Sequence, residues 1–409
     1  MASNAKIIGD LIAADASVAI PGDGVILASD LADGSVTTAK LADANVTIGK
    51  IATTVPLGTK NLIINGDMKI AQRGTSVTSL SSGYGYKTVD RFMFDTSGTI
   101  GTWTMSQDSD VPSGQGFSNS VKYTCTSGAT KSADAQLRLN QYIEAQNLQH
   151  LKYGTANAES TTLSFWVKSN KTGTFAVWML QFDTGTAKTI SQLVTISSAD
   201  TWEKKTLTYA GDTSGQIDND NGTGLLLVLQ FVAGTDLTSG TLATSWENIT
   251  TANLAAGQTI DLCDTTSNYI NITGVQLEVG DTATPFEHLP LDMQLQKCKR
   301  YYEKSIEHNV GSPISQSGSF NQMYVARTTS NNYGIYYNVF KVEKRASPTV
   351  TIYGYDGTLG QLSNADSGAN IGAGGVIHNN TVGFVTKNAS GGNIGAQMIT
   401  HNWTAESEL

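Results

Sequence analysis

The feature that most constrains the fold is a series of short segments in which side chains alternate between two faces, as on a β-strand. In one such segment, Leu163, Phe165 and Val167 alternate with Ser164, Trp166 and Lys168. Residues 269–277 alternate in the same way, 175–182 is an aromatic-rich strand, and 201–209 is a further strand. The almost wholly apolar run 225–232 is typical of a strand buried within a sheet. Gly, Asn, Asp and Ser separate these segments. We therefore predict a β-sandwich, jelly-roll-like, over residues 59–289.

The composition favours the same fold class. Charged residues make up 15% of the 409 residues, against roughly 25% in an average globular protein. Thr, Ser, Asn, Gln and 41 glycines take their place, and such residues suit solvent-facing strand positions and tight turns. The length predicts roughly two to three domains. We expect a mainly β protein.

A ten-residue repeat distinguishes the N-terminal region, residues 1–58. The sequence LADGSVTTAK at 31–40 is followed by LADANVTIGK at 41–50, and no aromatic residue occurs in the first 55 positions. Each unit offers one or two apolar residues and cannot bury them alone. We expect burial against the same residues of sister chains, in an extended arm of an elongated homotrimeric fibre. A disordered linker is the alternative.

A single linking helix is predicted over residues 290–309. One apolar stripe runs along it, formed by Leu291, Leu295, Cys298, Tyr302 and Ile306. Pro290 suits a first helical turn. Basic residues occupy the other side, but the chain carries a net charge of −9, so we interpret the helix as a strut between domains.

Residues 310–409 return to strand-like patterns, at 333–342, 349–355 and 394–403, around a loop-like Gly/Asn/Ser-rich stretch at 357–375. Aromatic rings stack on the apolar faces of sugars, so this C-terminal β domain contains our candidate binding residues. They are Tyr333, Tyr336, Tyr353, Tyr355 and Trp403. The alternative is that members of this set, or Tyr337, form the domain core. Trp166 and Trp178 of the sandwich have the same two interpretations.

Several motifs resemble a family of phage tail-fibre and receptor-binding virion structural proteins. The opening NLIINGDM at 61–68, with AQRG at 71–74 and DRF at 90–92, is similar to the start of a domain in that family. The segments VQLEVG at 275–280 and TPFE at 284–287 resemble its closing motif, and CKRYYEK at 298–304 and the N-terminal repeat also fit. The C-terminal hundred residues match only loosely.

The resemblance implies a virion location in the tail, after synthesis in the host cytoplasm. It implies that residues 1–58 attach to other virion tail proteins and that the C-terminal domain binds a glycan or protein of the host surface, without enzymatic activity. A purely structural virion component, such as a head fibre or connector, is the alternative. A glycan depolymerase is a third hypothesis, although no pair of carboxylates stands out.

Other chemistry has little support. The net charge of −9 and the absence of a Lys/Arg cluster outside the predicted helix argue against nucleic acid as a partner. The five histidines show no metal-binding spacing, and no nucleophile elbow, phosphate loop or dinucleotide motif occurs, so we predict no cofactor, metal or catalytic residue. Asp218 and Asp220, before Gly222, fit an acidic turn better than a calcium loop, although calcium remains open.

The remaining predictions concern cysteines, membranes and buried charges. We interpret Cys125, Cys263 and Cys298 as isolated thiols made in a reducing compartment. Neither a signal peptide nor a stretch long enough to insert into a membrane is recognisable. Arg73 and Arg91 are charges close to apolar strands, and we expect them to pair with buried acids, the candidates being Asp67, Asp90 and Glu278.

Overall fold

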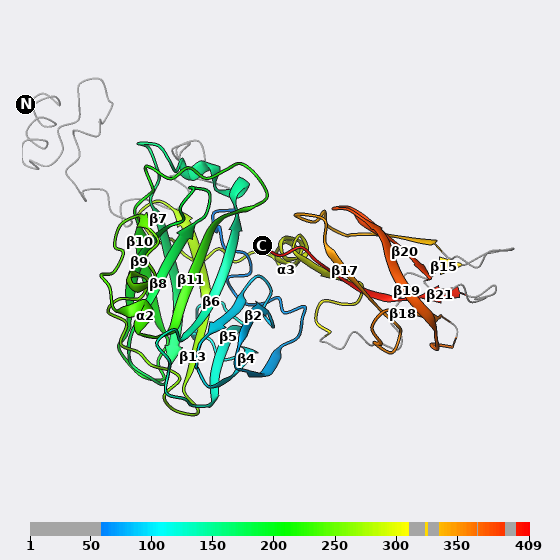
Figure 1. Cartoon of the computed structure of the whole chain (residues 1–409), viewed down its shortest axis with the longest axis horizontal. Helices are drawn as coiled ribbons and strands as arrows, with labels where there is room; N and C mark the ends of the chain where they lie inside the picture. Colours follow the sequence, from blue (N-terminus) through cyan, green and yellow to red (C-terminus); the bar gives the residue numbers. More distant parts are fainter. Residues whose placement is uncertain (1–58, 311–323, 326–334, 366, 389–397) are drawn as a thin grey trace, which may run out of the picture. The chain divides into compact units, whose positions relative to one another are not determined.

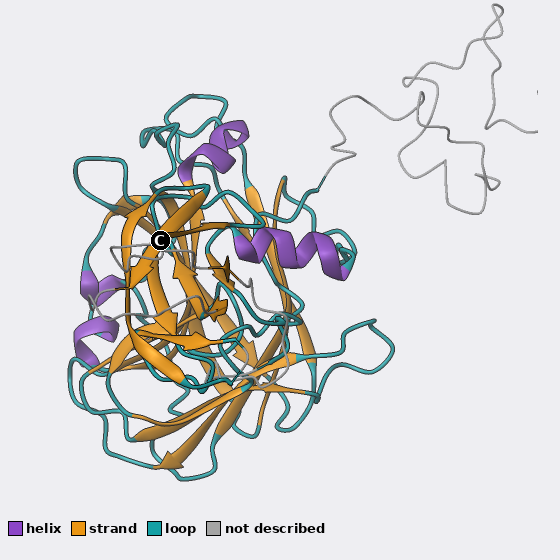
Figure 2. Cartoon of the chain, turned by 90° about the vertical axis from the view of Figure 1, so that its right-hand side faces the viewer, coloured by secondary structure: helices purple, strands orange, loops and turns teal. Residues whose placement is uncertain are grey.

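The computed structural model describes residues 59–310, 324–325, 335–365, 367–388 and 398–409. The predicted N-terminal arm and its ten-residue repeat lie outside the described residues. The described part is mainly β, as predicted, with few helical turns among many strands (Figures 1 and 2).

Two antiparallel sheets face each other to form the predicted sandwich (Figure 1). The six-stranded sheet has the order β1 (Ser76–Leu80), β4 (Thr102–Asp108), β5 (Ser120–Ser127), β13 (Tyr269–Val279), β7 (Thr161–Ser169), β10 (Glu203–Tyr209). The seven-stranded sheet has the order β12 (Glu247–Asn248), β9 (Lys188–Ile196), β8 (Gly173–Gln181), β11 (Thr223–Ala233), β6 (Gln136–Glu144), β3 (Met93–Ser97), β2 (Gly83–Tyr86). Neighbours in sequence are often not neighbours in a sheet, because the chain crosses between the two layers.

The core between the sheets is formed by the inward members of each alternation. In β7, Leu163, Phe165 and Val167 are fully buried, as the sequence pattern predicts. Both faces of strand β11 are buried, so its apolar residues belong to two separate clusters. Its inward residues join the main core, and its outward residues pack under the segment that contains α2 (Thr235–Thr238) and η5 (Thr251–Asn253). A further helical turn, η4 (Ala145–Leu151), follows β6.

The opening and closing motifs of the sandwich lie against each other. Leu62 N donates to Leu277 O at 2.9 Å, and Val275 N donates to Gly66 O at 2.9 Å. A Cβ on Gly66 would lie 2.0 Å from Val275 O, so only glycine permits this approach. Asn61 adds two side-chain hydrogen bonds to the backbone of β13. The two motifs that carry the resemblance therefore form one structural seam.

The predicted linking helix is shorter than its pattern indicates. Helix α3 (Leu291–Lys299) has nine residues, and the chain then forms β14 (Tyr302–Lys304). Three of the five stripe residues, Cys298, Tyr302 and Ile306, are buried, but Leu291 is 49% exposed, and Tyr302 lies in β14 rather than in the helix. The cause is a distant partner: β14 pairs with β22 (Asn402–Glu406), about a hundred residues further along the chain.

The C-terminal residues form two smaller sheets. The three-stranded sheet has the order β14, β22, β17 (Thr349–Tyr353). The other has the order β15 (Tyr324–Val325), β21 (Met398–Thr400), β18 (Gln361–Asn364), β19 (Asn370–Asn379), β20 (Gly383–Asn388), β16 (Ile335–Val339). The Gly-rich stretch predicted as a loop thus contains β18 and the start of β19. Glycines are tolerated there because β18 and β19 pair antiparallel with each other.

The described residues can be searched for disulfides, membrane-spanning helices and metal-binding groups. The three cysteines are free and buried, as expected for isolated thiols. In the described ranges no helix is long and apolar enough to cross a membrane, and no group of three or more His, Cys, Asp or Glu side chains could hold a metal ion.

Candidate functional site

The predicted binding residues of the C-terminal domain do not form one surface. Tyr333 lies outside the described residues. Tyr336 and Trp403 are only 3% and 5% exposed, so they belong to the domain core. Trp403 lies edge-on to Phe340 and Phe384, at ring-centroid distances of 5.6 and 5.3 Å. Because stacking on a sugar needs an exposed ring face, the binding prediction for these two residues is wrong.

Two members of the predicted set remain at the surface in part. Tyr353 ends β17 and Tyr355 follows it, and both side chains are half-buried. Tyr337, for which both a binding role and a place in the core were considered, is 54% exposed on the edge strand β16. Trp178 of the sandwich is 2% exposed and Trp166 is half-buried.

A stronger site lies on the outer face of the seven-stranded sheet. Side chains alternate along each strand, so the residues between the core positions face away from the core. In one row across the sheet, Tyr84 of β2 is opposite Asp95 of β3, which is opposite Arg138 of β6, which is opposite Gln230 of β11. In the next row, Asn140 is opposite Val228, and Val228 is opposite Trp178 of β8.

Aromatic rings surround this part of the sheet. Tyr84 is 77% exposed on edge strand β2, and Phe182, directly after β8, is 40% exposed. Tyr142 of β6 is half-buried, and its ring centroid lies 6.3 Å from that of Phe182. Together with Asp95 and Arg138 we call these residues the outer-face platform. The adjoining area of the sheet, over β8 and β11, is covered by apolar residues of the α2–η5 segment.

The charges of the platform are paired. Arg138 lies 2.6 Å from Asp95, and the side chains are 19% and 15% exposed. Asn140 Nδ2 donates to the same carboxylate at 2.8 Å. The Arg138 guanidinium also lies over the Trp178 ring, 5.9 Å from its centroid. Burial, and next the negative charge of Asp95, raise the pKa of Tyr142, which keeps its hydroxyl protonated at neutral pH.

Below the platform, five buried polar atoms have no hydrogen-bond partner among the described residues. They are Arg138 Nε, Asn140 Oδ1, Trp178 Nε1, Ser191 Oγ and Gln230 Oε1. Ser191 belongs to the same row as Trp178, so all five come from one face of the sheet. An unpaired buried polar group costs about 1–3 kcal/mol. Trp178, Ser191 and Gln230 are buried on β8, β9 and β11, so the unpaired groups next to the platform are those of Arg138 and Asn140 on β6.

Sequence reasoning missed this platform, although β6 contained a signal. Leu137, Leu139 and Ile143 alternate with Arg138, Asn140 and Tyr142. This is the pattern of a strand whose outer face carries hydrogen-bonding and aromatic groups. The contributions of Tyr84, Asp95 and Phe182 depend on strand pairing and could not be found from one segment.

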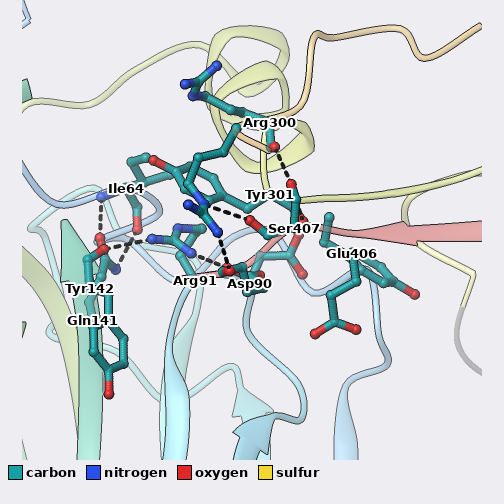
Figure 3. A network of polar contacts seen from close by, with 12 residues as sticks. Ile64, Asp90, Arg91, Gln141, Tyr142, Arg300, Tyr301, Glu406 and Ser407 are labelled. Atoms are coloured by element: carbon teal, nitrogen blue, oxygen red, sulfur yellow. Dashed lines mark hydrogen bonds and ion pairs between the residues drawn. The ribbon is translucent and has the colours of Figure 1, made fainter. Parts of the chain in front are cut away.

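A second polar cluster joins the C-terminal residues to the sandwich, in the region shown in Figure 3. The Glu408 carboxylate accepts hydrogen bonds from Arg91 and, at 3.1 Å, from Arg73. The guanidinium of Arg91 lies over the Tyr301 ring at 3.5 Å, and that of Arg73 over the Tyr302 ring at 3.7 Å. We call these residues the Glu408 clamp.

The backbone around the clamp is also held in place. Ser407 N donates to Tyr301 O at 2.7 Å, and Ser407 Oγ donates to Arg300 O at 3.0 Å (Figure 3). Arg345 donates to the carbonyls of Ser407 and Glu408, both at 2.9 Å. The end of β22 is thereby fixed to the region that follows α3.

The clamp corrects the predicted partners of Arg73 and Arg91. Asp67 pairs with Lys69 at 2.9 Å, and Glu278 accepts from Thr284, so neither bonds to an arginine. Asp90 accepts from Gln72, at 2.9 Å from its backbone and 2.6 Å from its side chain. Burial lowers the pKa of Arg73, but Glu408 and then Asp90 outweigh it, and the net effect is a raised pKa.

The segment considered as a calcium loop is held by hydrogen bonds within itself and to Arg345. Asp220 Oδ1 accepts from Gly222 N at 2.8 Å, which is the hydrogen bond of an Asx-type turn. Asn221 exchanges hydrogen bonds with the backbone and side chain of Arg345. Asp218 N donates to Asp183, whose pKa is raised by burial and by the neighbouring acids. The turn thus contacts the C-terminal domain.

Comparison with known proteins gives structural matches over about half of the chain. The enzymatically active domain of tailspike protein 4 from bacteriophage CBA120 is 15% identical with a TM-score of 0.30, over 54% of this chain and 21% of that one. A proposed sugar-binding protein from Bacteroides thetaiotaomicron is 10% identical with a TM-score of 0.30, over 54% and 100% of the two chains. The module TmCBM61, solved with β-1,4-galactotriose, is 10% identical with a TM-score of 0.26, over 54% and 99%.

No protein-family model matches this sequence, and no curated protein matches it. The match to the tailspike spans about a fifth of that chain. Similarity at this level does not identify a ligand or an activity, so these must be argued from the residues themselves.

Proposed function

We propose that this protein is a phage fibre subunit that attaches to the host surface by binding glycan on the outer-face platform, without cleaving it. The observation that carries the proposal is the combination of Tyr84, Tyr142 and Phe182 with unpaired hydrogen-bonding groups on one sheet face. Aromatic rings stack on the apolar faces of sugars, while polar groups bind the hydroxyls. The proposal moves the principal site from the C-terminal domain to the sandwich.

The sequence resemblance supports the virion setting. Its opening and closing motifs form the seam at Gly66 and Val275, which closes the sandwich that carries the platform. In our proposal the protein is a homotrimer in the tail, and residues 1–58 contact other tail proteins. Three platforms on one fibre would bind a repetitive surface far more tightly than one, because the second and third contacts are intramolecular.

The proposed lack of hydrolysis is supported by the charges at the platform. Glycoside hydrolysis uses two carboxyl groups about 5–10 Å apart on either side of the bond that is cleaved. Asp95 is the carboxylate of the platform, and it is occupied by Arg138 and Asn140. A carboxylate paired in this way suits the binding of a sugar rather than the cleavage of a glycosidic bond.

The test is to measure binding of host-surface oligosaccharides to the purified full chain by calorimetry. Tyr142→Ala and Tyr84→Ala should each weaken binding by about 2- to 12-fold, since an aromatic stacking contact is worth about 0.5–1.5 kcal/mol. Tyr337→Ala is the matched control, because Tyr337 is also an exposed tyrosine but lies on β16.

Four results would contradict parts of the proposal. Loss of binding in Tyr337→Ala alone would return the site to the C-terminal domain. Shortening of the oligosaccharide during incubation would show an enzyme. Absence of binding to any host glycan would favour a purely structural virion component, and a monomer in mass photometry would exclude the trimer.

A further inference from the structure

We infer that the outer-face platform selects uncharged, hydroxyl-rich sugars over acidic ones, and that Asp95 is the residue that sets this selectivity. The inference rests on the proposed glycan-binding function and adds the chemical class of the ligand. It depends on two independent observations, the pairing of the platform charges and the kinds of polar atom that remain unpaired.

The first observation is that the cation of the platform is already neutralised. Arg138 contacts Asp95 at 2.6 Å, within a sheet surface where both side chains are more than four-fifths buried. A carboxylate or phosphate ligand would have to compete with Asp95 for this guanidinium and would be repelled by it. Lys87 Nζ lies near Gly85, whose position alternates to the other side of β2, so it does not add a charge to this face.

The second observation is the mixture of unpaired donors and acceptors. Asn140 gives its Nδ2 to Asp95, so its Oδ1 is the free acceptor. Gln230 gives its Nε2 to Val232 O at 2.6 Å, but its side chain is fully buried on β11, so its Oε1 is not within reach of a ligand. These assignments follow from the hydrogen bonds of the amide nitrogens.

Arg138 Nε is an unpaired donor on the same face of β6 as Asn140, so the platform offers a donor as well as an acceptor. A hydroxyl group both donates and accepts, and it can satisfy either kind of atom. A carboxylate group can only accept, so it would leave Asn140 Oδ1 unpaired beside a negative charge. Ligand hydroxyls, directly or through water, are therefore the complementary partners.

The experiment compares neutral host-surface oligosaccharides with the same molecules oxidised at C6 to uronic acids. Wild-type protein should bind the neutral form at least ten-fold more tightly. Its affinity should change less than two-fold between about 50 and about 500 mM NaCl, because no net charge is paired on binding. Asp95→Asn should reduce the preference at least five-fold and make binding of the acidic form salt-dependent, since Arg138 is then free.

Asp108→Asn is the matched control. Asp108 pairs with Lys122 at 3.2 Å on the six-stranded sheet, and its side chain is 25% exposed. The Asp108→Asn protein should keep the wild-type preference for the neutral oligosaccharides. Equal or tighter binding of the oxidised form by wild-type protein would overturn the selectivity and leave glycan binding intact. Absence of binding to both forms would overturn the proposed function and this inference with it. The comparison of the two forms with wild-type protein does not require any variant to fold.

Discussion

Replacing Glu408 by glutamine should loosen the attachment of the C-terminal strands to the sandwich. Glu408 is the shared partner of Arg73 and Arg91, and the side chains are 6%, 10% and 1% exposed. The amide has nearly the same shape but no charge, so Glu408→Gln leaves two buried guanidinium groups without their carboxylate. The change is therefore electrostatic rather than steric.

The magnitude follows from the burial of the three groups. Removing one partner of a buried ion pair costs about 3–5 kcal/mol, because the other charge stays buried. The Tyr301 and Tyr302 rings lie 3.5 and 3.7 Å from the two guanidinium carbons and keep part of the stabilisation. We therefore expect the lower end of the range, about 3 kcal/mol.

Hydrogen exchange of β14 and β22, together with urea unfolding, would measure the effect. Exchange in these strands should accelerate by about 100-fold, which corresponds to about 3 kcal/mol. Glu406→Gln is the matched control, because Glu406 also contacts Arg73, at 3.3 Å, but its side chain is 49% exposed. An exposed pair is worth less than about 1 kcal/mol. If both variants exchanged at the same rate, the clamp would not be the anchor that we describe.

Three further predictions concern stability. Burial raises the pKa of Glu144, but the Arg300 hydrogen bonds at 2.8 Å outweigh it, so the pKa lies below 4.5. The folded state should therefore lose stability as the pH falls below 4.5 through this lowered pKa, and Glu144→Gln should flatten that loss in urea titrations. Lys344→Met should lower the free energy of unfolding by about 3–5 kcal/mol, because it leaves the Glu303 carboxylate buried at 0% exposure without its cation. The double variant Lys344→Met with Glu303→Met should recover most of this stability. A double variant as unstable as the single one would contradict the prediction. Trp403→Ala should destabilise the C-terminal strands by about 3–5 kcal/mol in the same assay, and a change below about 1 kcal/mol would mean that the ring is not core.

The sequence predicted the sandwich well because its alternation is a local property. The pattern in β7 assigns Leu163, Phe165 and Val167 to the core without any knowledge of the partner strands. The same reasoning failed for Tyr336 and Trp403. Both are aromatic residues in a polar, Gly-rich region, and local sequence could not decide whether a ring packs inward or faces solvent.

The candidate site could be predicted only in part. The outward positions of β6 were visible in its alternation, but the partners of Arg138 were not. Tyr84 and Asp95 reach it through the pairing of β2, β3 and β6, and Trp178 reaches it across β11. A one-residue shift of any of these pairings would exchange the two faces and remove the site.

By itself, the sequence determined the class of the fold and the presence of strands and turns, because these depend on residues within a few positions of one another. Only the tertiary structure decided that the predicted helix ends at Lys299, that Glu408 is the partner of two arginines, and that aromatic and polar groups gather on the seven-stranded sheet. The physical reason is that strand register and ion pairing join residues hundreds of positions apart. Their energy depends on burial, which no local pattern encodes.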